Sequence, residues 1–225
     1  MLFALPAMGA GEQQPHHKGA DQPQVLAPGY SALTFAAPAA GSYSLPSLGA
    51  AADAVLLDSS GEPVSLHALY DAKTVVLSFI YTTCPDVNGC PLATFVLSQV
   101  QQRLSSHDSL AGDVRLISVS FDPVNDSPEV MADYGSSFRR HDIDWRFLTS
   151  GSDARLAPVL DDYYQAVIRD IGPDGEPIGT MSHILRVFLI DRDKNIRNIY
   201  SPSFLHPDIL LADILTVTAS ELPTD

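Results

Sequence analysis

A run of eight residues, Thr74–Tyr81, constrains the fold more than any other feature of the chain. It is almost entirely apolar and rich in β-branched and aromatic side chains, which predicts a strand buried on both faces of a mostly parallel sheet. A second run of this kind spans Val114–Phe121. Between the two runs, apolar side chains from Leu92 to Leu104 recur at spacings of three and four, as on one face of a helix. Strand, helix and strand in this order predict a right-handed crossover between two parallel strands.

The same alternation continues to the end of the chain. Ser127 and Pro128 have the residue types of an N-cap and a first helical position. The expected strands are 54–57, 74–81, 114–121, 145–148, 186–190 and 195–200, and the expected helices are 91–104, 128–138, 154–168 and 207–221. The last two strands are joined by a short turn at Asp191–Lys194, so we expect them to pair antiparallel. The sequence therefore predicts an α/β fold with a central mixed sheet flanked by helices.

The composition limits the size of the fold and the kinds of partner. The chain has 225 residues and a mass of 24.2 kDa, enough for one sizeable domain or at most two small ones. It has 13 Lys and Arg against 27 Asp and Glu, a formal net charge of −14. This acidic balance argues against nucleic acid and disfavours an anionic membrane surface as partner. No run of about 18 apolar residues occurs in the sequence, so we expect no membrane-spanning helix within it.

Residues 1–50 differ in composition from the rest. The first 52 residues contain three charged residues and six of the 17 prolines, and Ala, Gly, Ser and Pro dominate. Such a segment cannot bury a continuous apolar face, so we expect a flexible or extended N-terminal extension before a domain at residues 51–225. Residues 1–10, MLFALPAMGA, resemble either the remnant of an export signal or a plain flexible tail. The first alternative implies an exported protein that faces the periplasm or cell envelope; a membrane tether would need a segment that precedes residue 1.

We expect the chemistry at the two cysteines, Cys84 and Cys90. Both lie between the end of a predicted strand and the start of a predicted helix, which is where ligands bind in open α/β sheets. The N-terminus of a helix favours thiolate over thiol, and thiolates bind metals and attack disulfides. Asn88-Gly89 is a turn signal that can bring the second sulfur back toward the first. A purely structural disulfide is the plain alternative.

A metal at this place needs a third ligand. Two soft thiolates select Cu(I), zinc or iron–sulfur chemistry, but two are too few for zinc or a cluster. His183 is the best placed histidine, because it comes just before the predicted strand 186–190, in a loop that would face the cysteines. Two thiolates and one imidazole would make a compact three-ligand copper site. For the other histidines we expect structural or surface roles: His16, His17, His67, His107, His141 and His206.

Three blocks of the sequence resemble the Sco/SenC family of thioredoxin-like copper proteins, over roughly residues 50–222. The family's cysteine motif, Thr-x-Cys-Pro-Asp-Val-Cys-Pro, is similar to Thr82–Pro91, where the extra pair Asn88-Gly89 makes the spacing between the cysteines five residues instead of three. The family's Ser-Val-Asp-Pro-x-x-Asp-Thr-Pro-Glu block is similar to Ser120–Glu129. Its copper histidine, a few residues before an apolar strand that ends in Asp, is similar to His183 before Asp191.

The resemblance implies a thioredoxin-like fold that binds Cu(I) or Cu(II) through three ligands: Cys84, Cys90 and His183. Asp86 would tune these ligands as an acid close behind them, whereas Asp122 and Asp126 are interpreted as loop and cap residues. The resemblance further implies a copper-binding assembly factor that delivers copper to, or reduces the cysteines of, the copper site of a respiratory oxidase. Its partner would be the copper-site subunit of that oxidase.

Two other functions stay open. A thiol–disulfide oxidoreductase would use Cys84 and Cys90 as catalytic residues and cycle them through a disulfide without obligatory copper. The five-residue spacing is unlike the two-residue spacing of general thioredoxins, and the nearest proline before the facing strand is Pro177, well upstream of it. A narrow reductase of one copper-site disulfide could coexist with copper binding. The third function is a redox or copper sensor that signals by binding a partner.

Overall fold

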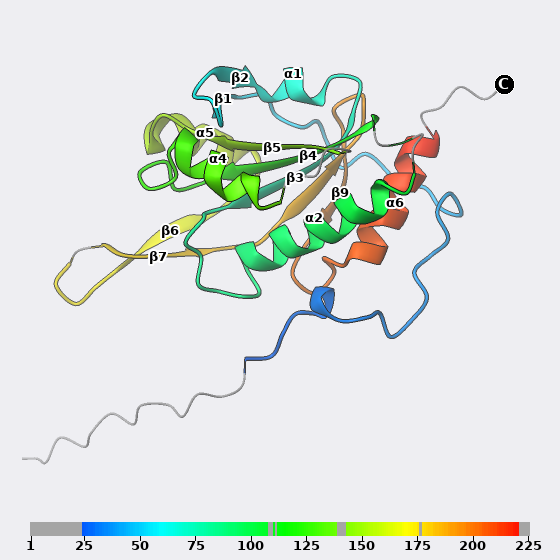
Figure 1. Ribbon diagram of the computed structural model, residues 1–225, viewed down its shortest axis with the longest axis horizontal. Coiled ribbons are helices and arrows are strands. Elements are labelled where there is room, and N and C mark those ends of the chain that lie inside the picture. The colour runs from blue at the N-terminus through cyan, green and yellow to red at the C-terminus, as the bar shows by residue number, and fades with distance from the viewer. Residues whose placement is uncertain (1–23, 108–109, 111, 139–142, 176, 221–225) are drawn as a thin grey trace, which may run out of the picture.

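The computed structural model describes residues 24–107, 110, 112–138, 143–175 and 177–220. The strands are β1 (Val55–Asp58), β2 (Pro63–Ser65), β3 (Thr74–Ile80), β4 (Val114–Ser120), β5 (Asp144–Thr149), β6 (Val167–Ile171), β7 (Pro177–His183), β8 (Val187–Ile190) and β9 (Ile196–Tyr200). The helices are η1 (Pro28–Tyr30), α1 (Leu66–Tyr70), α2 (Cys90–Leu104), α4 (Pro128–Ser136), α5 (Asp153–Asp162) and α6 (Pro207–Ser220). Seven strands form one sheet with helices on both faces, and β6 and β7 form a separate hairpin that extends away from it (Figure 1).

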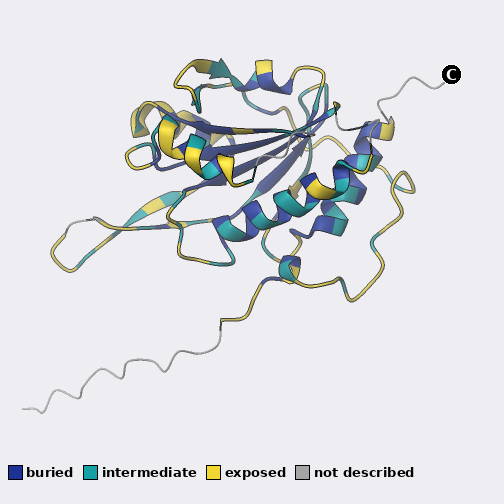
Figure 2. Ribbon diagram, in the orientation of Figure 1, coloured by how far each residue is buried: buried dark blue, intermediate teal, exposed yellow. Residues whose placement is uncertain are grey.

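Three parallel strands form the centre of the sheet, whose strand order is β2-β1-β5-β4-β3-β8-β9. β3 pairs in parallel with β4, and β4 pairs in parallel with β5. β8 pairs antiparallel with β3 and with β9, while β1 pairs antiparallel with β5 and β2. All seven residues of β3 are buried, and the central strands are the most buried part of the fold (Figure 2). The predicted parallel core strands and the antiparallel last pair are therefore confirmed.

The helices cover both faces of this sheet. On one face α2 packs beside α6 (Figure 1), and α2 also contacts α4, where the hydroxyls of Thr94 and Tyr134 lie 2.8 Å apart. On the other face the ends of α1 and α5 meet, where the hydroxyls of Tyr70 and Tyr163 lie 2.8 Å apart. Helix α4 begins as predicted, because the Ser127 side chain accepts a hydrogen bond from the Val130 N–H. This three-layer arrangement confirms the thioredoxin-like α/β fold expected from the sequence.

The prediction of one helix over 154–168 is wrong in its second half. Helix α5 ends at Asp162, and Tyr164 has φ +52, in the left-handed region that a helix cannot continue through. The following residues, rich in β-branched side chains, form strand β6, which pairs antiparallel with β7. Strand β7 was not predicted either, nor were the short elements β2 and α1. As a result His183 is the last residue of a strand and does not lie in a loop.

Residues 24–50 extend along the outside of the domain, and η1 is their one helical turn (Figure 1). They are joined to the domain at several points: Leu48 N–H donates to the Ile196 carbonyl at 2.7 Å, and the Tyr43 hydroxyl donates to Asp213 at 2.5 Å. Residues 1–23, which contain the predicted export signal and His16-His17, lie outside the described residues. Among the helices that are described, none is long and apolar enough to cross a membrane.

Candidate metal centre

Cys84 and Cys90 lie where β3 ends and α2 begins. The chain turns after β3, with the Cys84 N–H donating to the Tyr81 carbonyl at 3.3 Å, and α2 begins at Cys90 itself. Pro91 occupies the first turn of α2. Proline is tolerated there because a backbone N–H in the first turn would have no acceptor within the helix. Both cysteines are free; Cys90 is buried and Cys84 is half-buried. The Cys84 thiol is therefore partly open to solvent, whereas the Cys90 thiol is enclosed.

The His183 ring faces the cysteines from strand β7. Its Nε2 lies 3.6 Å from the Cys90 sulfur, and its Nδ1 lies 3.4 Å from the Met181 carbonyl. If Nδ1 carries the proton toward that carbonyl, Nε2 keeps its lone pair toward the sulfurs, as a metal ligand requires. The rings of Phe121 and Tyr81 pack against the imidazole, with centroids 4.9 and 6.0 Å from it. These contacts limit the orientations that the imidazole can adopt.

The three candidate ligand atoms converge. The sulfurs of Cys84 and Cys90 and a ring nitrogen of His183 all lie within 4.8 Å of one another. Three ligands in a plane, each about 2.3 Å from a central ion as zinc-bound sulfur is, would lie about 4.0 Å apart. The site can therefore reach metal-binding geometry with side-chain movements of about 1 Å or less. No second group of three or more Cys, His, Asp or Glu side chains with this convergence occurs among the described residues.

The two thiols differ strongly in acidity. The Cys90 S–H donates a hydrogen bond to the Cys84 sulfur, which lowers the pKa of Cys84 from 9.0 to about 6 although burial opposes the change. The Cys90 backbone N–H, at the start of α2, adds to this effect. Burial raises the pKa of Cys90, and its hydrogen bond and proximity to Cys84 raise it further. At neutral pH the metal-free site therefore holds a Cys84 thiolate beside a Cys90 thiol.

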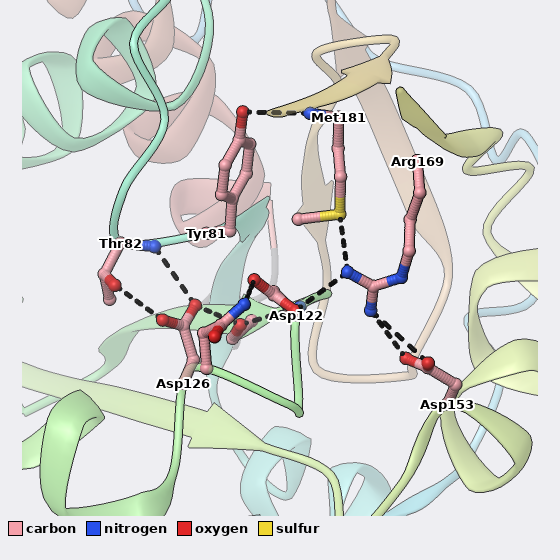
Figure 3. A network of polar contacts seen from close by, with 9 residues as sticks. Tyr81, Thr82, Asp122, Asp126, Asp153, Arg169 and Met181 are labelled. Atoms are coloured by element: carbon pink, nitrogen blue, oxygen red, sulfur yellow. Dashed lines mark hydrogen bonds and ion pairs between the residues drawn. The ribbon is translucent and has the colours of Figure 1, made fainter. Parts of the chain in front are cut away.

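A polar network ties the β6–β7 hairpin to the sheet beside the site (Figure 3). Arg169 on β6 bonds to three groups: Asp122 at 3.1 Å, Asp153 at 3.1 Å and the Met181 sulfur at 3.6 Å. The Met181 N–H donates to the Tyr81 hydroxyl at 3.4 Å. Because Met181 stands two residues before His183 on the same strand, these bonds hold the strand that carries the histidine.

The acidic residues near the cysteines have partners within the protein. Asp126 is buried and accepts from the Thr82 N–H at 3.0 Å and from the Thr82 hydroxyl at 2.5 Å, two residues before Cys84 (Figure 3). Asp122 pairs with Arg169, and both aspartates lie in the loop between β4 and α4, as expected, whereas the cap of α4 is Ser127 and not an aspartate. The Asp86 carboxylate accepts from the Asn88 N–H at 3.0 Å, and Asp86 reaches the Cys84 sulfur through its carbonyl oxygen, at 3.9 Å.

The remaining described histidines lie outside the cluster. His67 Nε2 contacts the Ala51 carbonyl at 2.8 Å, and the buried His206 contacts the Ser31 carbonyl at 2.8 Å. His107 is exposed. His16, His17 and His141 lie outside the described residues.

Sequence reasoning missed the aromatic and sulfur-bearing residues around the imidazole: Tyr81, Phe121 and Met181. Tyr81 also donates its backbone N–H to the Cys90 sulfur at 3.4 Å. Tyr81 and Phe121 are the last residues of the two predicted buried runs, and the carboxyl ends of neighbouring parallel strands lie together. Their positions at these strand ends could therefore have placed both rings beside the site from the sequence. No comparable signal marked Met181, because the hairpin itself was not predicted.

Comparisons with known proteins agree with this geometry. The sequence model of the SCO1/SenC family matches residues 50–219, about three quarters of the chain. The chain belongs to the SCO1/SenC family. Its relatives include the SCO1 protein homolog of Bacillus subtilis, which is 26% identical over 144 residues, covering 64% of this chain and 69% of the relative.

Solved members of the family have the same fold. The structure of Bradyrhizobium japonicum ScoI with copper bound matches with a TM-score of 0.60 and 30% identity, covering 75% of this chain and 99% of that one. BsSco, a member of the Sco family of cytochrome c oxidase assembly proteins, matches with a TM-score of 0.61. It is 23% identical and covers 78% of this chain and 98% of that one, so this second likeness supports the fold alone.

Proposed function

We propose that this SCO1/SenC protein binds one copper ion, as Cu(I) or Cu(II), through Cys84, Cys90 and His183. The observation that carries the proposal is the convergence of two sulfurs and one imidazole nitrogen within 4.8 Å. Soft thiolates favour Cu(I), and imidazole is also a suitable ligand for copper. The copper-bound ScoI relative supports copper as the metal. Asp86 would tune the site through its backbone hydrogen bond to Cys84, which lowers the pKa of that thiol.

We further infer a role in assembling the copper site of a respiratory oxidase, with the copper-site subunit as the partner. Family membership supports this role, and the protein would either deliver copper to that site or reduce its cysteines. Such work implies a protein exported to the periplasm or cell envelope. In this proposal residues 51–225 are the working domain and residues 1–50 are an N-terminal extension.

Copper binding is tested by titrating the reduced, metal-free protein with Cu(I) against a chromophoric chelator. We expect one tightly bound ion in the wild type and a large loss of affinity in Cys84→Ser and in His183→Ala. His107→Ala is the matched control, because His107 is exposed and outside the cluster. Tight stoichiometric binding that persists in both site variants would refute the proposed ligands.

Thiol–disulfide exchange is a second candidate function, favoured by the unequal acidity of the two thiols. The Cys84 thiolate would attack a partner disulfide, forming a mixed disulfide and releasing one partner thiolate, which takes up a proton. Cys90, after losing its proton, would then attack the Cys84 sulfur. That step closes the Cys84–Cys90 disulfide and releases the second partner thiol, so the partner gains the two electrons that the protein loses.

The reduction potential of the Cys84–Cys90 pair distinguishes the two functions. Cycling requires a potential within the range of exchanging thiols, roughly −120 to −270 mV. A value below about −300 mV, as structural disulfides have, would argue against cycling and leave copper binding as the function.

A further inference from the structure

The Asn88-Gly89 pair, which lengthens the loop between the cysteines, contacts a segment far away in the sequence. We call residues 24–31 the strap. The Ala27 N–H of the strap donates to Asn88 Oδ1 at 2.7 Å, and Asn88 Nδ2 donates to the Val25 carbonyl at 2.8 Å. The Asn88 side-chain amide thus pairs with the backbone of the strap as a peptide group pairs in a β-ladder.

A third hydrogen bond joins the strap to the same loop. The Tyr30 hydroxyl donates to the Val87 carbonyl at 2.5 Å, directly beside Asn88. The Gln24 side chain adds a longer contact to Asp86, at 3.5 Å. The strap therefore contacts three consecutive residues of the loop, from Asp86 to Asn88.

The strap is itself fixed to the domain. The Tyr30 ring packs on Phe95 of α2, with centroids 5.0 Å apart. Gly29 is buried so closely that a Cβ there would lie 2.3 Å from the Leu205 carbonyl oxygen and 3.0 Å from Leu92. The Ser31 carbonyl contacts the buried His206 at 2.8 Å. A firmly anchored segment can restrain a loop, which a freely moving tail could not.

The restrained loop borders the Cys84 sulfur. The Gly89 N–H donates to the Asp86 carbonyl at 2.9 Å, which closes a turn. A Cβ on the buried Gly89 would lie 3.4 Å from the Cys84 sulfur. Asn88 thus contacts the strap on one side. On its other side follows Gly89, which lies beside the Cys84 sulfur at the start of α2.

We propose that Asn88 is a positioning residue, by which the strap holds the five-residue loop so that the Cys84 and Cys90 sulfurs stay together. Without the strap, the loop would sample more conformations and the two sulfurs would meet less often. Only the identity of the bound metal rests on the proposed function. The proximity of the two sulfurs can be measured without copper. Groups held close together react as if at high concentration, so the strap is expected to favour the disulfide.

The test uses the whole metal-free chain equilibrated with mixtures of reduced and oxidised glutathione. In this reaction the Cys84 and Cys90 thiols form one disulfide while one oxidised glutathione becomes two reduced ones, and maleimide labelling with mass spectrometry gives the oxidised fraction. We expect Asn88→Ala to lower the equilibrium constant for disulfide formation about 3- to 10-fold, a potential about 14 to 30 mV less negative. Tyr30→Phe, which keeps the ring on α2, should change it in the same direction.

Two comparisons separate positioning from general damage. Tyr43→Phe removes a hydroxyl bond of the same kind from the same extension, but at Asp213, and should leave the constant within twofold of the wild type. The Asn88→Ala/Tyr30→Phe double variant should change the constant by less than the product of the single effects, because both substitutions release the same strap. A wild-type constant in Asn88→Ala, or an equal change in Tyr43→Phe, would overturn the proposal. Failure of the wild type to bind copper would overturn the proposed function alone and leave this result standing.

Discussion

Cys90→Ala should move the ionisation of Cys84 to higher pH, because it removes the S–H group that donates to the Cys84 sulfur. That hydrogen bond is the largest cause of the low pKa of Cys84, which is about 6. At pH 7 such a thiol is about 90% ionised, whereas a thiol at the reference pKa of 9.0 is about 1% ionised. The Cys90 backbone N–H remains in the variant, so only part of the effect should disappear.

The size of the change follows from the strength of the lost bond. A hydrogen bond to a charged group contributes about 1.5–3 kcal/mol, and 1.36 kcal/mol corresponds to about one pH unit. The midpoint of the Cys84 ionisation curve should therefore rise by about one to two pH units. The thiolate fraction at pH 7 would fall from about 0.9 to between about 0.5 and 0.1. Alkylation at pH 7 should slow by about 2- to 9-fold, since the thiolate is the reacting form.

The assay is the rate of iodoacetamide labelling at Cys84 between pH 4.5 and 9.5, followed by peptide mass spectrometry on reduced, chelator-treated protein. In the wild type, Cys84 should label with a midpoint near 6, while the buried Cys90 labels far more slowly. His107→Ala is the control, because His107 is exposed and lies outside the cluster, so it leaves the Cys90 donors to Cys84 in place. Equal labelling of both cysteines in the wild type, or an unchanged Cys84 midpoint in Cys90→Ala, would refute the assigned hydrogen bond.

Three further results are expected. Cu(I) binding at pH 7.5 should release about one proton per ion, from Cys90, so the affinity for Cu(I) should rise about tenfold per pH unit near neutrality. Calorimetric titration in buffers of different ionisation enthalpy measures the number of protons released, and binding without proton release would contradict the expectation. Gly89→Ala should weaken Cu(I) binding severalfold, because its Cβ would lie 3.2 Å from the Asp86 carbonyl oxygen and 3.4 Å from the Cys84 sulfur, whereas Gly112→Ala, with nothing within 4 Å, should not. Asp126→Ala should lower the free energy of unfolding in urea by about 1–3 kcal/mol, since the Thr82 N–H loses its partner, and an unchanged midpoint would contradict that role.

The central strands were predictable because they carry a strong local signal. The run Thr74–Tyr81 is buried throughout β3, and a buried strand between parallel neighbours needs apolar side chains on both faces. Helix α2 was predictable for a related reason, since its apolar face and its early proline are local features. The cysteines and His183 followed from their positions beside these elements.

The β6–β7 hairpin was not predictable in the same way. Its strands lie outside the main sheet, and many of their side chains are exposed or half-exposed, so no buried apolar run marks them. Arg169 holds the hairpin through Asp122 and Asp153, contacts between residues distant in sequence that no local pattern reports. The strap escaped prediction for the same reason, because its composition indicated only an extended segment.

The unequal thiols connect the two proposed functions. A bound copper ion needs both sulfurs as thiolates, so the ion must displace the proton that Cys90 holds. Thiol exchange instead needs the resting state itself, with Cys84 ionised and Cys90 protonated. Once the two sulfurs are joined in a disulfide, neither thiolate is available to copper. Copper loading and disulfide formation are therefore mutually exclusive states of one site, and the relative supply of copper and oxidant decides which state forms. A strap that brings the sulfurs together would favour both states over the separated thiols, so loosening it should weaken copper binding and disulfide formation in parallel.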